Sequence, residues 1–502
     1  MIRFTHALPK TRLRQDHAPG SFATSPRARR RRATRRRSRI SASSRACARA
    51  RVGIVGRRSR GRDHARPAAT PNPRFTPAAT CRFHYAQRRI VAGTSPSPHP
   101  RLPRVTLPIA TRRRGGRGRR TTRSRPRERE QLADGRPFSF LRVTRPELEL
   151  EPGTSSDDPA AHATARRNLE MLERESILRR EDRPHVLLYR LVMRGHRQIG
   201  VVCCCEVGQY EEGTIVRHER TRVDKELERT HHFEACDAHT EPVFLAHRDD
   251  AALDELVRRD VNDRPHFHFV APDGITHTMW TVPDPDEYVD AFRRLPKAYI
   301  CDGHHRVAAA AALARARRET GASRSAEAQR FLAVIFPLSH LRIMPYNRIV
   351  KDLHGLSPEQ LMRRLRGVGQ VEPTSAAEPC QRGQFGIYVG GRWWTLTVDP
   401  VVAQTTDPVA ALDVSVLQRL VLEPIFGIAD PRRDPRLDFV GGIRGTDSLE
   451  RAVDSGEAGA AFALHPTSMH ELLEVADAGG IMPPKSTWFE PKLRSGLVVH
   501  PF

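Results

Sequence analysis

The sequence has few aromatic residues and no long apolar run. Aromatic residues make up 6% and hydrophobic residues 38% of the 502 residues, which is low for a chain that folds along its whole length. No apolar stretch approaches the ~18 residues needed to span a bilayer, and the N-terminus lacks the apolar segment of a secretory signal. We therefore expect a partly disordered, soluble, cytoplasmic protein with no membrane partner.

Several common functional motifs are also missing. The chain contains neither the G-x-x-x-x-G-K-[ST] loop of P-loop ATPases nor the G-x-G-x-x-G fingerprint of Rossmann dehydrogenases. Its eight cysteines form no C-x-x-C pair, so we expect free thiols. The close histidine pairs His231/His232, His266/His268 and His304/His305 lack the spacing of zinc motifs, so we predict no metal site from them.

Positive charge is concentrated at one end of the chain. Residues 1–130 hold 37 of the 84 Lys and Arg residues and 4 of the 58 Asp and Glu residues, a net charge of +33, which leaves −7 for residues 131–502. Because the N-terminal segment is rich in Arg and Ser and shows no periodicity, we expect it to be disordered. A part of the chain that folds with a net negative charge is not typical of a strong DNA binder.

Three explanations of residues 1–130 remain open. The segment could be a basic arm that binds polyanions without specificity, an organelle transit peptide, or the translation of an incorrect upstream reading frame. The abrupt change of composition at Gln131 to Asp134 favours the third explanation.

Residues 131–502 predict an α+β fold. Helices are expected over 160–182, 217–234, 251–259, 307–316, 358–365, 414–422 and 468–476, and strands over 185–193, 198–207, 242–245, 266–270, 277–282, 297–301, 331–336, 386–389 and 393–398. The order of these elements shows no regular βαβ repeat. We divide the chain into a disordered segment (1–130), an α+β domain (131–345) and a C-terminal α+β region (346–502).

The segment Asp302 to Arg306 is the most informative motif. It reads Asp-Gly-His-His-Arg between an apolar strand and an Ala-rich helix. Asp302 could cap this helix, and Gly303 would permit a close approach of the backbone to a ligand. The helix N-terminus, His304, His305 and Arg306 would suit a nucleotide phosphate. The alternative is a capped helix whose histidines face solvent.

A second polar cluster precedes this motif. It contains His218, Glu219, Thr221 and Lys225 within the stretch 215–225. Such residues could bind an anion and supply a general base, for which Glu219 or Asp224 are candidates. A solvated helix with i,i+4 ion pairs is the alternative.

Two further segments carry candidate binding residues. Arg348 lies at the end of an apolar strand, where it could hold phosphate or flank a turn. The C-terminal segment Met482 to Phe489 contains two prolines that fix a loop and present Lys485 beside two hydroxyl groups. An ordered structural loop would explain the same residues.

Together these segments resemble a bacterial and archaeal family of unknown function, domain of unknown function 1015. The hallmarks of that family are an Asp-Gly-His-His-Arg motif, an earlier His-Glu-x-Thr segment followed by Lys, and a terminal Pro-Pro-Lys-Ser-Thr-x-Phe-x-Pro-Lys. Here they are Asp302 to Arg306, His218 to Thr221 with Lys225, and Pro483 to Lys492, within a similarity that runs from Gly135 to Phe502. A Pro-Tyr-Asp turn near the start of the family has no counterpart in residues 1–130.

The resemblance implies a ParB/sulfiredoxin-like core and a distant relation to kinases of free serine. It implies that Asp302, Gly303, His304, His305 and Arg306 hold nucleotide phosphates, to which we add Lys485. The expected function is a phosphotransferase that uses ATP or ADP with Mg²⁺ and acts on a small hydroxyl compound. The predicted catalytic residues are Glu219, Asp302 and His305, with Glu219 assigned as base by our own inference, and the predicted substrate-binding residues are His218, Thr221, Lys225 and Arg348. The alternative is a non-catalytic nucleotide-binding or ParB-like, DNA-associated regulatory protein.

Overall fold

The computed structural model describes residues 2–4, 133–181, 184–321 and 325–502. The disorder expected for residues 1–130 lies outside the described residues, apart from strand β1 (Ile2–Phe4), whose backbone pairs with β2 (Leu178–Arg180). Among the described residues, no helix has the length and apolar character that crossing a membrane requires.

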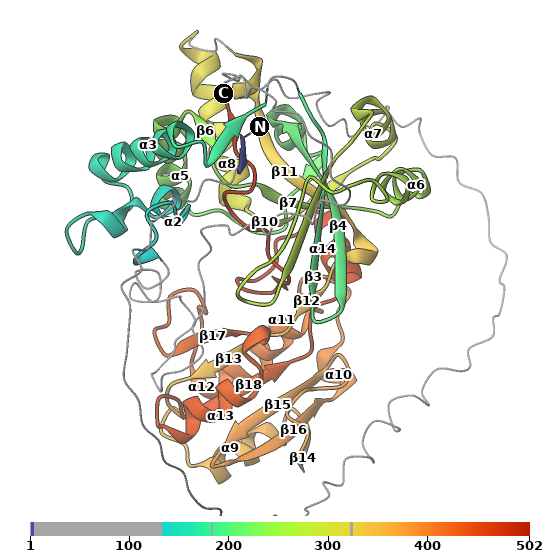
Figure 1. Ribbon diagram of the computed structural model, residues 1–502. Coiled ribbons are helices and arrows are strands. Elements are labelled where there is room, and N and C mark those ends of the chain that lie inside the picture. Colours follow the sequence, from blue (N-terminus) through green and yellow to red (C-terminus); the bar gives the residue numbers. More distant parts are fainter. Residues whose placement is uncertain (1, 5–132, 182–183, 322–324) are drawn as a thin grey trace, which may run out of the picture. The chain divides into compact units, whose positions relative to one another are not determined.

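A mixed eight-stranded sheet organises the first part of the described chain (Figure 1). Its strand order is β5-β10-β7-β11-β4-β3-β9-β8. In chain order the strands are β3 (Leu187–Met193), β4 (His196–Glu206), β5 (Ile215–Val216), β7 (Val243–His247), β8 (Phe267–Val270), β9 (Thr276–Thr281), β10 (Ala298–Asp302) and β11 (Arg330–Pro337). The pairs β5/β10 and β7/β11 are parallel and the others antiparallel. The predicted α+β class with a mixed sheet is therefore confirmed.

Helices cover this sheet because its strands are apolar on both faces. In β7, Val243 and Leu245 belong to one buried cluster, and Phe244 and Ala246 belong to another, as the two-residue period of a strand requires. The helices of this part are α2 (Leu141–Thr144), α3 (Pro159–Arg174), α4 (Val207–Glu211), α5 (Val223–Cys236), α6 (Ala251–Asp260), α7 (Pro285–Phe292) and α8 (His304–Glu319). Side chains of α6, α7 and α8 pack on the face that carries Val243 and Leu245.

A second, six-stranded antiparallel sheet follows, with the order β14-β16-β15-β18-β13-β17. Its strands are β13 (Tyr346–Val350), β14 (Gly369–Thr374), β15 (Gln384–Val389), β16 (Arg392–Val398), β17 (Leu437–Gly441) and β18 (Ala460–Leu464), and the helices around it are α9 (Pro358–Leu365), α10 (Pro400–Ala403), α11 (Asp413–Leu417), α12 (Glu423–Phe426), α13 (Asp447–Asp454) and α14 (Met469–Asp477). Phe385 and Phe462 share one buried cluster with Tyr189 and Phe336 of the first sheet. The domain boundary at residues 345/346 stays a prediction.

The C-terminal segment returns to the first part of the chain. β19 (Trp488–Phe489) pairs with β12 (Ile343–Met344), and β20 (His500–Pro501) pairs with β6 (Ala238–His239). Short 3-10 turns lie at Pro146–Glu149, Ala326–Gln329, Leu338–His340 and Gly442–Arg444, and a π-helical turn at Gln418–Leu422 joins α11 to α12. Phe489, which follows the Pro-Pro-Lys-Ser-Thr motif, packs against Phe244 of β7 with ring centroids 5.6 Å apart.

Two predicted helices have different bounds in the structure. The helix expected over 217–234 begins only at Val223, so that residues 217–222 form a loop, and the helix expected over 160–182 ends at Arg174 and is followed by β2. Cysteines 203, 205, 236 and 301 are free thiols, as expected.

Candidate functional site

The topology brings the two central motifs together. Strands β5 and β10 are parallel neighbours, with Ile215 opposite Ala298 and Val216 opposite Tyr299. Their carboxyl ends therefore lie at one edge of the sheet, so that the loop after β5, which carries His218 and Glu219, is placed beside the end of β10. Ligand sites of open sheets with parallel strands commonly occur at such carboxyl ends.

Asp302 ends β10 and Gly303 begins α8. Gly303 has a φ of +102°, and a Cβ at this position would lie 2.9 Å from Nε of Arg306, so the turn requires glycine. Gly303 itself is the N-cap of α8, and no side chain caps the helix. The expectation that Asp302 caps α8 is therefore wrong, because its carboxylate accepts a hydrogen bond from Nζ of Lys492 at 2.9 Å instead. The backbone N–H of Arg306 donates to the carbonyl oxygen of Gly303 at 2.8 Å, which leaves the N–H groups of His304 and His305 at the start of α8 to bind an anion.

Arg306 connects this turn to the neighbouring strand. Its guanidinium donates to the carbonyl oxygen of Pro242, just before β7, and lies 3.9 Å from the carboxylate of Asp302. The carboxyl group of Glu241 is also held here, by Oγ of Ser495 at 2.7 Å and by Arg229 at 3.6 Å. Burial opposes the ionisation of Glu241, but Arg306 and Arg229 outweigh it and hold the pKa of Glu241 at about 2. Arg306 is thus fixed in place as well as charged.

Two buried histidines meet behind the turn. The rings of His218 and His304 pack edge to face with centroids 4.6 Å apart, and their side chains are almost fully buried. Both ring nitrogens of His218 and Nε2 of His304 have no hydrogen-bond partner among the described residues. Burial lowers the pKa of His218 to about 4, and burial followed by the nearby His218 lowers the pKa of His304 well below its usual value. Both imidazoles are therefore neutral at pH 7.

Glu219 lies next to these histidines. Its Oε2 atom is 3.9 Å from Nδ1 of His304, and its side chain is 41% exposed. Burial raises the pKa of Glu219, and the carboxylate of Asp302 acts in the same direction, whereas the ammonium group of Lys485 opposes the rise. A partly exposed carboxyl group with a raised pKa is suited to act as a general base.

The C-terminal segment completes the site with two lysines. The backbone N–H of Met482 donates to the carbonyl oxygen of His218 at 2.8 Å. Lys485 is exposed with a φ of +60°, and Nζ of Lys492 binds Asp302 and lies 5.3 Å from the centre of the Trp488 ring. Burial would raise the pKa of Asp302, but Lys492 and Arg306 outweigh it and hold that pKa well below its usual range. Asp302 is thus ionised and ion-paired at neutral pH.

The remaining candidate residues are engaged elsewhere. Oγ1 of Thr221 donates to Glu226 at 3.2 Å, and Lys225 binds Glu228 within α5. Arg348 is buried and donates to the carbonyl oxygens of Tyr346 at 2.5 Å and of Lys485 at 3.1 Å; burial lowers its pKa to about 10. Arg348 therefore positions the loop that presents Lys485. A direct contact of these residues with a substrate stays a prediction.

His305 lies on the side of α8 that faces the start of α5. It is half-buried, and Nδ1 of its ring has no hydrogen-bond partner among the described residues. Burial lowers the pKa of His305, while Glu226 acts in the opposite direction. The neutral ring could donate or accept a hydrogen bond, and its catalytic role stays a prediction.

Sequence reasoning did not select two residues that the structure places at the site. Lys492 ends the terminal motif, so its place in that motif was the available signal. Glu241 precedes a predicted strand and carries no motif of its own. Only the antiparallel pairing of β7 with β10, in which Phe244 lies opposite Asp302, shows that Glu241 and Pro242 are near the turn.

A family model matches most of the described chain. It is described as "Protein of unknown function (DUF1015)", and it matches residues 122–415. Comparison with curated protein sequences gives no match.

Several solved structures are similar to the chain at low identity. A variant of a free serine kinase in complex with AMP is 14% identical with a TM-score of 0.30, and the match covers 57% of this chain and 86% of that one. A conserved hypothetical protein from Pyrococcus furiosus is 14% identical with a TM-score of 0.29, and the match covers 59% of this chain and 93% of that one. C-terminally truncated SbnI from Staphylococcus aureus is 11% identical with a TM-score of 0.32, and the match covers 59% of this chain and 85% of that one.

Proposed function

The chain belongs to the family described as "Protein of unknown function (DUF1015)", and we propose that its three motifs form one site for nucleotide-dependent phosphoryl transfer to a small hydroxyl compound such as free serine. The observation that carries this proposal is the convergence of Glu219, Asp302 and Lys492 at the N-terminus of α8. These residues come from three segments far apart in the sequence.

Phosphate binding is the first element of the proposal. The N-terminus of α8 supplies N–H groups and a partial positive charge. Lys485 adds an exposed ammonium group close enough to Glu219 to affect its pKa, and Arg306 is held in place by the Pro242 carbonyl oxygen. Together they would bind the phosphates of ATP or ADP, with Gly303 allowing a close approach of the backbone.

Proton transfer is the second element. Glu219 would accept the proton of the substrate hydroxyl group, because burial raises its pKa toward the range in which a carboxylate is an effective base at neutral pH. The neutral imidazole of His304, 3.9 Å away, would keep Glu219 oriented without fixing its charge. Asp302 would hold Lys492 near the phosphates.

Mg²⁺ belongs to the proposal as the ion that would neutralise charge on the transferring phosphoryl group. The carboxylates of Glu219 and Asp302 are hard oxygen donors of the type that Mg²⁺ prefers. Glu219 would also accept the hydroxyl proton, and Asp302 would hold Lys492 near the phosphates. A reaction on free small molecules would place the protein in the cytoplasm.

Phosphoryl transfer by the full chain tests the proposal. Purified protein is incubated with ATP or ADP, Mg²⁺ and serine, and phosphoserine is measured. We expect Glu219→Gln to lower kcat by about a hundredfold or more, since general-base catalysis contributes about 10² to 10⁴. The control Glu457→Gln alters an exposed carboxyl group and should leave kcat unchanged. Equal rates for wild type and Glu219→Gln would exclude Glu219 as the base.

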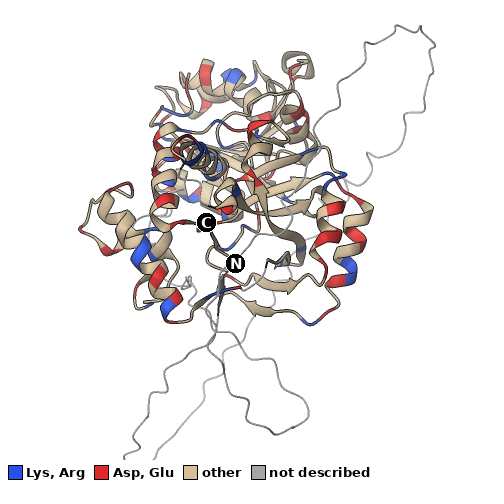
Figure 2. Cartoon of the chain, turned by 90° about the horizontal axis from the view of Figure 1, so that it is seen from above, with Lys and Arg blue, Asp and Glu red and all other residues tan. Residues whose placement is uncertain are grey.

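The DNA-associated alternative has no comparable support. Figure 2 shows acidic and basic residues interspersed along the helices, and residues 131–502 carry a net charge of −7. Binding of DNA through phosphate contacts requires a basic face.

A further inference from the structure

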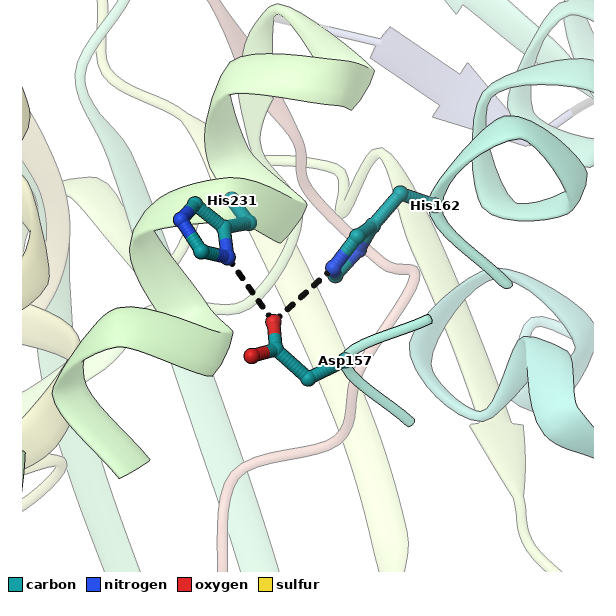
Figure 3. Close-up of side chains that lie close together, drawn as sticks. All are labelled: Asp157, His162 and His231. Carbon is teal, nitrogen blue, oxygen red and sulfur yellow. Dashed lines mark hydrogen bonds and ion pairs between the residues drawn. The ribbon is translucent and has the colours of Figure 1, made fainter. Parts of the chain in front are cut away.

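A separate cluster of one carboxylate and two imidazoles, Asp157, His162 and His231, lies between α3 and α5. Nε2 of His162 and Nδ1 of His231 lie 3.0 Å and 2.9 Å from the same oxygen, Oδ1 of Asp157. Asp157 is in the turn before α3, His162 is in the first turn of α3, and His231 is in the C-terminal half of α5. Figure 3 shows the two imidazole rings directed at this one carboxylate from opposite sides.

The spacing of the donor atoms fits a small metal ion. The three donor atoms lie within 4.8 Å of one another. Zn²⁺ binds imidazole nitrogen and carboxylate oxygen at about 2.0–2.2 Å, so ligand atoms in a tetrahedral site are about 3.3–3.5 Å apart. A shift of a few tenths of an ångström by the Asp157 carboxylate would open that space. The side chains of Asp157 and His231 are 38% and 48% exposed, so this shift is sterically feasible and an ion has access.

The charge balance also favours a cation. Within the part of the chain that the structure describes, the ion-pair partners of Asp157 are these two imidazoles. An ionised carboxylate that faces two imidazoles, which bind metals in their neutral form, is a common ligand set for divalent transition metals.

We propose that Asp157, His162 and His231 form a zinc-type metal site that links α3 to α5, with one coordination position open to water. Two imidazole nitrogens and one carboxylate oxygen would be the protein ligands. The ion would hold together two helices that both contribute to one buried cluster, α3 through Leu169 and α5 through Cys236. This site is separate from the residues of the proposed phosphotransferase and does not depend on that function.

Titration of the full chain with zinc chloride tests the proposal. The protein is treated with a chelator, dialysed and titrated by calorimetry, with zinc content measured after a second dialysis. We expect one tight site per chain in the wild type and a rise in Tm on zinc addition, because an ion that binds the folded state stabilises it.

Two variants separate a metal site from a hydrogen-bonded cluster. Asp157→Asn keeps an oxygen that can accept both N–H groups but removes the anionic ligand, and His231→Gln changes a half-exposed side chain without disturbing the core. Each should weaken zinc binding at least tenfold. The control His470→Ala removes an exposed histidine that pairs with Glu474 and should bind zinc as the wild type does. Absence of a tight site in the wild type, or unchanged affinity in both cluster variants, would overturn the proposal.

Discussion

The ion pair between Lys492 and Asp302 provides the sharpest test of how the site is built. Lys492→Met removes the ammonium group but keeps an apolar chain that can still pack on Trp488. Nζ of Lys492 lies 2.9 Å from Oδ2 of Asp302, and the side chains of Lys492 and Asp302 are 43% and 41% exposed. At that exposure solvent screens the pair, so we expect a loss of about 1 kcal/mol in the free energy of unfolding at pH 7.

The functional effect should exceed the effect on stability. Without Lys492, Arg306 at 3.9 Å is the one ion-pair partner that Asp302 keeps among the described residues, and the negative charge of Asp302 would repel a nucleotide phosphate. We expect the Kd for ADP, measured by calorimetry on the full chain, to rise about tenfold, which corresponds to about 1.4 kcal/mol.

Lys297→Met is a matched control for this experiment. Lys297 forms an ion pair of 2.8 Å with Asp477, and both side chains are 32% exposed. This variant should lose a similar amount of stability, as urea unfolding would show, and bind ADP as the wild type does. Equal ADP affinities for Lys492→Met and Lys297→Met would refute the role that we assign to Lys492.

Three further predictions concern stability, each measured by urea unfolding. Burial lowers the pKa of His218 to about 4, so between about pH 6.5 and pH 4 the unfolded chain takes up a proton that the folded chain does not. As the pH is lowered through this range, the free energy of unfolding therefore decreases by up to about 1.4 kcal/mol per pH unit. His218→Leu should make this decrease less steep, and an unchanged slope would contradict a neutral, buried His218. Gly303→Ala should lower the free energy of unfolding by about 2 kcal/mol, and Gly274→Ala by about 1 kcal/mol. Both glycines have a positive φ, but only a Cβ at Gly303 would meet Arg306. Equal losses of stability would exclude that contact. Arg348→Met should lower the free energy of unfolding by about 2–3 kcal/mol, since it leaves the carbonyl oxygens of Tyr346 and Lys485 without their donor. Unchanged stability would show that these hydrogen bonds do not hold the loop that carries Lys485.

Local sequence patterns predicted many of the elements. The apolar runs on either side of Gly195 form the hairpin of β3 and β4, and the Ala-rich stretch after Arg306 is part of α8. These elements depend on contacts between residues that are close in sequence, so that composition and periodicity suffice to predict them.

The loop after β5 could not be predicted in the same way. Charged residues at helical spacing suggested that the helix begins near Arg217, but Met482 binds the carbonyl oxygen of His218, and α5 begins at Val223. The contact joins residues 264 positions apart, which no local pattern reveals. The local pattern likewise predicts that Asp302 caps α8, whereas its carboxylate binds Lys492.

The convergence of the three motifs also depends on long-range pairing. Each motif was visible in the sequence, but their approach in space requires the parallel pairing of β5 with β10 and the return of the C-terminal segment through β19. Strand order cannot be read from several short apolar runs that could pair in more than one way.

Titration of ADP and ATP into the full chain tests the central claim most directly. We predict that the wild type and the control Lys297→Met bind one nucleotide per chain with the same affinity. Lys485→Met, which changes an exposed side chain close to Glu219, should bind at least tenfold more weakly because one charged phosphate contact is lost. Absence of nucleotide binding by the folded wild type, or equal affinity in Lys485→Met, would contradict a phosphate site at the N-terminus of α8.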